Sequence, residues 1–151
     1  MGTLHAGTVS FEAIQVGDTL PTLVKEESQE TIDAYRALAI PGERTNWKDL
    51  HTDPSFARQG IFGGTVNMGV ATVSYLAQLL ETAFPVRSIL ARGARLSMQA
   101  RQPFRAGDVV SFTGTVVAKR HDAGQRLVDL ELVGTNTLGD TVARATATVV
   151  L

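Results

Sequence analysis

One stretch organises the chain: residues 46–84, NWKDLHTDPSFARQGIFGGTVNMGVATVSYLAQLLETAF. It opens as a polar loop that contains His51, passes through a glycine cluster at residues 60–64, and ends in an apolar helical pattern at residues 67–83. Apolar residues cover most of the wheel of this predicted helix, and Pro85 closes it. A helix that is apolar on nearly all sides must be covered on more than one side. We therefore expect the rest of the chain to pack around it.

Downstream of the predicted helix, the helical period gives way to the alternation of apolar and polar residues that is typical of β-strands. The alternation is clearest in residues 109–116 and 127–133. Turn residues separate the apolar runs, and consecutive strands with short connections form an antiparallel meander. We predict four strands, at residues 88–102, 108–120, 126–136 and 140–151.

Upstream, residues 19–26 predict a strand and residues 29–39 predict a helix with Ser28 as its N-cap. A second, short helix is predicted at residues 54–59, where Asp53 can act as the cap. A long apolar helix followed by long antiparallel strands favours an α+β structure of the hot-dog type, in which a curled antiparallel sheet wraps a long buried central helix. Such a sheet leaves an edge strand uncovered, so we expect a dimer.

Length and composition exclude several classes of protein. The chain has 151 residues, which fits a single domain at residues 1–151. Its 14 Lys+Arg against 15 Asp+Glu give no reason to expect a nucleic-acid partner or a membrane-surface partner. The absence of cysteine excludes disulfides, thiolate metal sites and a cysteine nucleophile, and the three histidines have no metal-ligand spacing. Polar residues interrupt the most apolar window, and the N-terminus has no signal-peptide pattern, so we expect a cytoplasmic protein.

His51 is the main candidate for chemistry in this sequence. It stands in a loop among other reactive side chains, and an imidazole can act as acid or base near neutral pH without a large pKa shift. A lone loop histidine can equally be a hydrogen-bonded structural residue. His5 and His121 lie in a predicted terminus and a predicted turn, so we expect both to be solvated. The glycines at residues 60–64 lack the spacing of a phosphate-binding loop, and we attribute them to loop geometry.

Several segments, in order and spacing, carry a family resemblance. The chain resembles MaoC-type hot-dog proteins, a group that includes R-specific enoyl-CoA hydratases and 3-hydroxyacyl-thioester dehydratases. The resemblance covers nearly the whole chain. The matching segments are Phe11-Glu12-x-x-x-Val16-Gly17-Asp18, the run His51 to Ala57, Gly69 with the apolar helix, the run Arg101 to Asp108, and the final hairpin, represented by Asn136 to Gly139 and Ala143 to Val149.

The catalytic pattern of this family is Asp-x-Asn-Pro-x-His. Aligned on His51, the pattern places Asn46 where the aspartate belongs and Asp49 where the proline belongs. The family also has a histidine before the helix glycine; here that position is Met68, while Gly69 is kept. The resemblance therefore implies a hydratase site in which the histidine remains and its acidic partner is replaced by an amide.

By this resemblance, the chain is an acyl-thioester hydratase/dehydratase without a cofactor or metal. It would act on an acyl-CoA or acyl-carrier-protein thioester, as a homodimer or with a second hot-dog subunit. His51 would be the acid–base group, Asn46 would position water or substrate, and the Gly69 N–H would donate to the thioester oxygen. We expect further substrate contacts from Gly64, Met68, Asp49 and Arg95.

The sequence leaves alternatives open. An arginine run could clamp the phosphates of coenzyme A or phosphopantetheine, or it could simply occupy solvated strand positions. Its members cannot all converge, because Arg92 and Arg95 would fall on opposite faces of a strand. The members of the run are Arg87, Arg92, Arg95, Arg101 and Arg105.

Two rivals to hydratase activity also remain. The first is a non-catalytic or attenuated hot-dog subunit that binds acyl thioesters or pairs with an active partner, as the loss of the aspartate at position 46 suggests. The second is a hot-dog thioesterase, which usually needs a carboxylate near the buried helix. Glu81 is the acid within that helix, and it stands at the far end.

Overall fold

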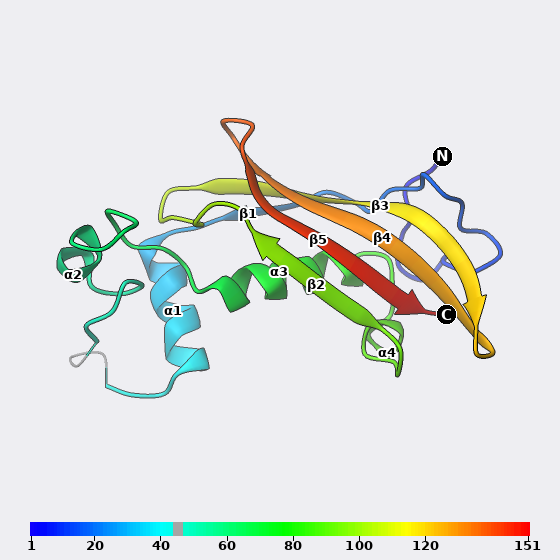
Figure 1. Ribbon diagram of the computed structural model, residues 1–151, viewed down its shortest axis with the longest axis horizontal. Helices are drawn as coiled ribbons and strands as arrows, with labels where there is room; N and C mark the ends of the chain where they lie inside the picture. Colours follow the sequence, from blue (N-terminus) through cyan, green and yellow to red (C-terminus); the bar gives the residue numbers. More distant parts are fainter. Residues whose placement is uncertain (44–46) are drawn as a thin grey trace.

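The computed structural model describes residues 1–43 and 47–151. Figure 1 shows an elongated molecule in which a curved sheet spans the length and helices lie on one side of it. The elements, in chain order, are β1 (Leu23–Glu26), α1 (Gln29–Ala39), α2 (Pro54–Arg58), α3 (Gly69–Glu81), α4 (Val86–Ile89), β2 (Arg95–Ala100), β3 (Val109–Asp122), β4 (Gln125–Asn136) and β5 (Thr141–Val150).

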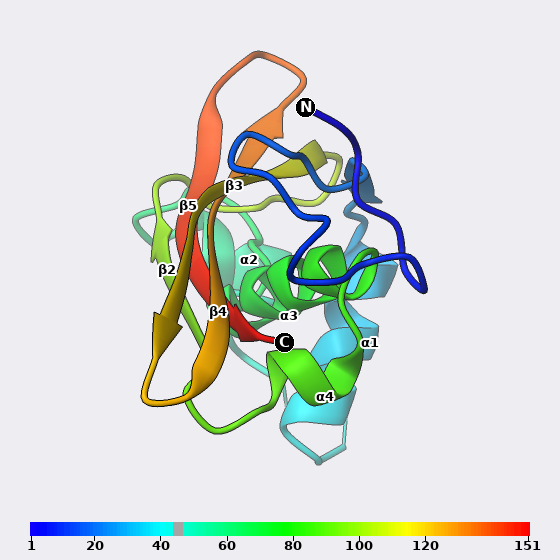
Figure 2. The ribbon, with the colours of Figure 1, turned by 90° about the vertical axis from the view of Figure 1, so that its right-hand side faces the viewer.

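The strands form one antiparallel sheet in the order β1-β3-β4-β5-β2. The predicted meander is confirmed as β3, β4 and β5, and β1 and β2 form the two edges. Figure 2 shows α3 lying inside the curl of the sheet, with α1 farther out on the same side. The α+β prediction of a curled sheet around a central helix is therefore confirmed.

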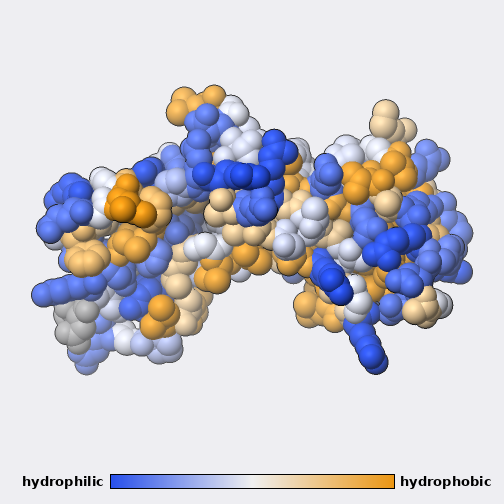
Figure 3. Space-filling view, viewed as in Figure 1, coloured by the Kyte–Doolittle hydropathy of each residue, from blue (hydrophilic) through white to orange (hydrophobic). Residues whose placement is uncertain are grey.

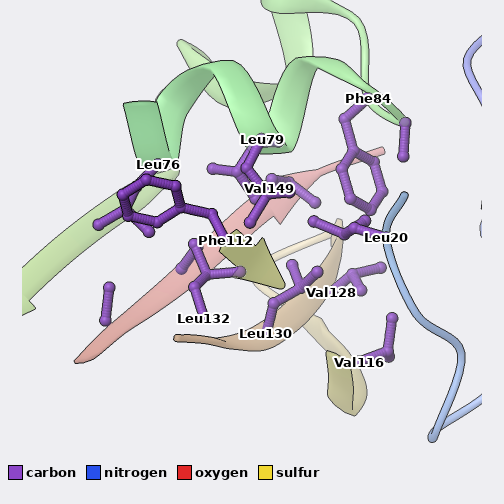
Figure 4. Close-up of a cluster of buried hydrophobic side chains, with 14 of the residues drawn as sticks. Leu20, Leu76, Leu79, Phe84, Phe112, Val116, Val128, Leu130, Leu132 and Val149 are labelled. Atoms are coloured by element: carbon purple, nitrogen blue, oxygen red, sulfur yellow. The ribbon is translucent and has the colours of Figure 1, made fainter. Parts of the chain in front are cut away.

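The core forms where the inner face of the sheet meets α3. Leu76 and Leu79 project from α3 toward Phe112, Leu132 and the neighbouring apolar side chains of β4 and β5 (Figure 4). The fit is close at Gly134, because a Cβ there would lie 2.6 Å from the Phe112 ring. This contact accounts for a glycine within a long strand.

α3 is buried only on the side that faces the sheet. The exposed side carries Val70, Ser74, Gln78 and Glu81. Figures 1 and 3 show that the molecule narrows at α3, between the α1–α2 end and the α4 end. Part of the expected second cover comes from this chain: the Ala6 N–H donates to the Thr82 carbonyl (3.1 Å) at the C-terminal end of α3, and the Tyr35 hydroxyl of α1 lies 3.0 Å from the Ser74 hydroxyl.

Two strand predictions were wrong in their first halves. The predicted strand at residues 88–102 begins instead with the helical turn α4, in which the Ser88 N–H donates to the Pro85 carbonyl (2.8 Å). Gly93 then takes a positive φ of 96°, so extended pairing starts only at Arg95. The predicted strand at residues 19–26 is regular only from Leu23, because Pro21 has no N–H to continue the ladder.

The helices upstream follow their local signals. α1 has the predicted bounds, and the Ser28 side chain accepts from the Thr31 N–H in a capping box. Asp53 caps α2 as predicted, by accepting from the N–H groups of Ser55 and Phe56. In the part of the chain that the structure describes, no helix is long and apolar enough to cross a membrane.

Candidate active site

A pocket of about 480 Å³ lies where three segments meet: the loop before α2, the start of α3, and the chain after β2. Backbone hydrogen bonds hold these segments side by side. The Val66 N–H donates to the Leu50 carbonyl (3.2 Å), and the Asn67 N–H donates to the Phe104 carbonyl (2.7 Å). The wall is mostly apolar, with a few polar groups. The lining residues are Leu50, His51, Phe62, Val66, Asn67, Gly69, Thr72, Ala100, Arg101, Gln102, Pro103 and Phe104.

His51 is fixed in the pocket wall by three hydrogen bonds. Its backbone N–H donates to Asp49 Oδ1 (2.9 Å), and its carbonyl accepts from Gln29 Nε2 (2.8 Å). Its ring Nδ1 lies 2.8 Å from the Val66 carbonyl oxygen. Because a carbonyl only accepts, Nδ1 must carry the proton, and in the neutral ring Nε2 keeps its lone pair. The arrangement therefore selects the tautomer in which Nε2 can act as a base.

Asp49 holds the loop rather than lining the pocket. Oδ1 accepts from the N–H groups of His51 and Thr52 and from the Thr52 hydroxyl, and Oδ2 pairs with Arg36 Nε on α1 (3.1 Å). Burial by itself raises the pKa of Asp49, but the hydrogen bonds from His51, Thr52 and Arg36 outweigh burial and lower the pKa below its usual range. Asp49 is therefore ionised near neutral pH; Oδ1 bonds within the loop that carries His51, and Oδ2 ties that loop to α1.

Replacing Asp49 with asparagine is expected to lower the free energy of unfolding by about 1–2 kcal/mol at pH 7, because the ion pair with Arg36 is lost. A lowered folded-state pKa stabilises the fold above the unfolded pKa, and this contribution disappears as pH falls through the folded pKa. The deficit of Asp49→Asn should therefore shrink from about pH 4 downward. Urea unfolding of both proteins from pH 7 to pH 3 measures it; a deficit that does not change with pH would contradict this account.

The start of α3 opens directly on the pocket. α3 begins at Gly69, and the preceding residue, Met68, makes no side-chain bond to the first turn. The first N–H groups of a helix lack partners within the helix and carry its positive end, so they suit a partly negative oxygen. A Cβ at Gly69 would meet no atom within 4 Å, which leaves room for a ligand to approach the backbone.

A buried polar cluster stands behind this helix start. Glu27, which is 4% exposed, accepts from Asn67 Nδ2, from the Thr31 hydroxyl (2.6 Å) and, at longer range, from the Tyr75 hydroxyl (3.4 Å). Asn67 in turn accepts the Met68 N–H through Oδ1 (2.7 Å). Burial and the negative charge of Glu27 raise the pKa of Tyr75 to about 12, so its hydroxyl stays a donor. The cluster ties β1, α1 and α3 together at the pocket.

Of the residues predicted for the site, the fold brings His51 and Gly69 to one pocket. Asn46 lies outside the described residues. Gly64, Met68 and Asp49 are neighbours of the lining residues but do not line the pocket themselves, and Arg95 lies exposed at the other end of β2 from Ala100. Arg95 and Ala100 are five residue steps apart along β2, or roughly 16 Å. Within one chain, the arginine that lines the pocket is Arg101.

Sequence reasoning missed Glu27, Asn67, Thr72 and Phe104. Thr72 could have been found, because it lies three residues after Gly69 and therefore on the same helix face. Glu27 carries no such signal, since only the packing of β1 against α1 and α3 buries it. Among the described residues, no group of three acidic or histidine side chains could hold a metal ion, and none of the pocket-lining residues is a carboxylate.

Comparisons with known proteins show relatives with the same fold. Solved structures similar to the chain include a MaoC-like dehydratase from Rhodospirillum rubrum (26% identity, 93% of this chain and 94% of that one, TM-score 0.73). They also include the (R)-hydratase from A. caviae involved in PHA biosynthesis (23% identity, 91% of this chain and 97% of that one, TM-score 0.71). A third is the ChsH1-ChsH2 complex from Mycobacterium tuberculosis (24% identity, 91% of this chain and 98% of that one, TM-score 0.70). No curated protein matches the sequence. The family model described as "MaoC like domain" matches residues 29–136, and the chain therefore belongs to the MaoC-like dehydratase domain family.

Proposed function

We propose that this protein catalyses the reversible addition of water to a 2-enoyl thioester, with an acyl-CoA as the substrate. One observation carries the proposal: His51, with Nε2 left as the free ring nitrogen, and Gly69, at the positive end of α3, line the same pocket. Membership of the MaoC-like family supports the same class of reaction.

Each step of hydration has a group in this pocket. Nε2 of His51 takes a proton from water as the water oxygen attacks C3, and electrons move toward the thioester oxygen. The Gly69 N–H stabilises the negative charge on that oxygen. The imidazolium then returns its proton to C2, which completes the addition. Dehydration runs through the same steps in reverse.

The substrate's two ends meet different surfaces. The apolar wall formed by Leu50, Phe62, Val66 and Phe104 suits an acyl chain. Arg101 is the pocket's cation and is exposed, so we propose it, rather than Arg95, as the chain's own contact for the phosphates of coenzyme A.

We propose that a second hot-dog subunit completes the assembly. β2 is an edge strand with no partner beyond β5 in the described residues, and unpaired edges of this kind favour strand addition. The exposed side of α3 offers a second, adjacent surface. A second copy of this chain or a related subunit would cover both surfaces; the similar ChsH1-ChsH2 structure is a complex of two proteins.

The decisive assay follows the absorbance of the conjugated enoyl thioester as crotonyl-CoA and longer enoyl-CoAs are added. Loss of absorbance without release of free thiol is the expected result. Release of thiol would instead indicate a thioesterase, which the site disfavours because Glu81 ends α3 away from the pocket. No turnover at all would contradict the proposal.

The runner-up is an attenuated subunit that works beside an active partner, because position 46 carries an amide where the family has a carboxylate. The Asn46→Asp variant distinguishes the hydratase proposal from the attenuated-subunit alternative. If the site is a hydratase with a missing acid, kcat should rise by about 10²-fold or more, since one acid–base group typically contributes that much. Inactivity of both forms alone, with activity on mixing with a second hot-dog protein, would favour the runner-up.

A further inference from the structure

The hydroxyl of Thr72 is an unexplained polar group in the apolar part of the pocket. Thr72 is 6% exposed and lines the pocket. Hydroxyls on helices usually bond a carbonyl one turn back, and two nearby ones do so: Ser74 bonds Val70 (3.0 Å), and Thr82 bonds Leu79 (2.6 Å). The Thr72 hydroxyl makes no hydrogen bond to any residue that the structure describes. Its hydroxyl is therefore available to whatever fills the pocket.

The position of Thr72 places it against the acyl chain. Thr72 follows Gly69 by three residues, so it lies on the same face of α3, about 4.5 Å farther along the axis. Burial increases in that direction: Gly69 is exposed, Thr72 is nearly buried, and Leu76 is fully buried. An acyl chain that extends inward from a thioester held at Gly69 would thus reach Thr72 a few carbons beyond the reacting atoms.

The nature of that chain follows from the cost of burying an unpaired hydroxyl. Solvent can bond Thr72 while the pocket is open. A plain hydrocarbon chain would displace the solvent and leave the hydroxyl without a partner, whereas a substituent with a hydroxyl or keto oxygen would restore the bond. Sites that hydrogen-bond a substrate group discriminate strongly against analogues that lack it.

We propose that the acyl group bound here carries an oxygen substituent a few carbons from the thioester, and that the Thr72 hydroxyl recognises it. This inference rests on the proposed function, because it takes the ligand to be an acyl thioester held at Gly69. It goes beyond that function by naming the class of acyl group and the residue that selects it.

The test compares hexenoyl-CoA with the analogue that carries a hydroxyl on its penultimate carbon. Wild-type protein should prefer the hydroxylated substrate by about tenfold or more in kcat/KM. Thr72→Val, which has the same shape without the hydroxyl, should bring this preference to about one, and Thr72→Ser should keep it. An equal preference in wild type and Thr72→Val overturns the inference. So does an equal fall in kcat on both substrates, which would place the hydroxyl at the reacting atoms instead.

A binding arm separates this inference from the proposed function. Calorimetry measures the dissociation constants of the corresponding saturated acyl-CoAs, which cannot react. If the hydroxylated acyl-CoA binds more tightly and Thr72→Val abolishes this selectivity, the inference is supported. If no enoyl-CoA is turned over in the same experiments, the hydratase proposal is contradicted. Turnover without selectivity in either arm overturns the inference alone. If neither acyl-CoA binds, both proposals fall.

Discussion

Replacing His51 with alanine is expected to lower kcat for enoyl-thioester hydration by about 10²–10⁴-fold, because His51 is the general acid–base group of the proposed mechanism. Among the described residues that line the pocket, no carboxylate or second histidine can take over the proton. KM should change much less, since the histidine acts on water and on C2 rather than on the bulk of the substrate. Steady-state absorbance kinetics on the purified variant measure both quantities.

A matched variant separates chemistry from loop structure. His51→Asn can keep a donor near the position of Nδ1 and so preserve the bond to the Val66 carbonyl, but it has no base at the position of Nε2. We expect it to be more stable than His51→Ala in urea yet equally inactive. His5→Ala, at an exposed position, is the control and should behave as wild type. Full activity in His51→Asn would remove the imidazole from the mechanism.

Replacing Glu27 with alanine is expected to lower the free energy of unfolding by about 2–4 kcal/mol. The reason is that Asn67 Nδ2, which is buried, would lose its acceptor, and Tyr75 and Thr31 would lose the group that links them. Removal of a buried charge offsets part of this cost. The same change should reduce activity, because Asn67 also bonds the Met68 N–H at the start of α3. Urea unfolding at pH 7 and the hydration assay measure the two effects.

The control for this prediction is Glu27→Gln. The glutamine oxygen can still accept from Asn67, and its amide can donate to the Thr31 hydroxyl, which can turn to the Ser28 carbonyl (2.9 Å). The loss of stability should therefore be less than half of that in Glu27→Ala. Combining Glu27→Ala with Asn67→Ala should cost less than the sum of the single changes, because they share one contact. Strict additivity would show that the cluster does not act as a unit.

The outline of the fold and half of the proposed site could be read from local patterns. The Ser28 and Asp53 caps, the meander of β3 to β5 and the apolar length of α3 all depend on spacings of a few residues, which sequence displays directly. The beginning of β2 was misjudged because the run Val86 to Ile89, with an apolar residue at each end, fits a helical turn as well as a strand. The deciding facts, a helical turn after Pro85 and a positive φ at Gly93, are set by packing at the end of α3.

From the sequence alone, the resemblance to MaoC-type proteins paired a loop histidine with a helix that begins at glycine, because His51 and Gly69 keep the positions of that family's pattern. What only the tertiary structure decided was the surroundings of that pair. The free nitrogen of His51 follows from the Val66 carbonyl, and Asp49 proved to hold the loop. Glu27 supports the start of α3 through its bond to Asn67, and Thr72 lines the pocket. Such roles depend on burial and on partners far along the chain, and spacing within a segment encodes neither.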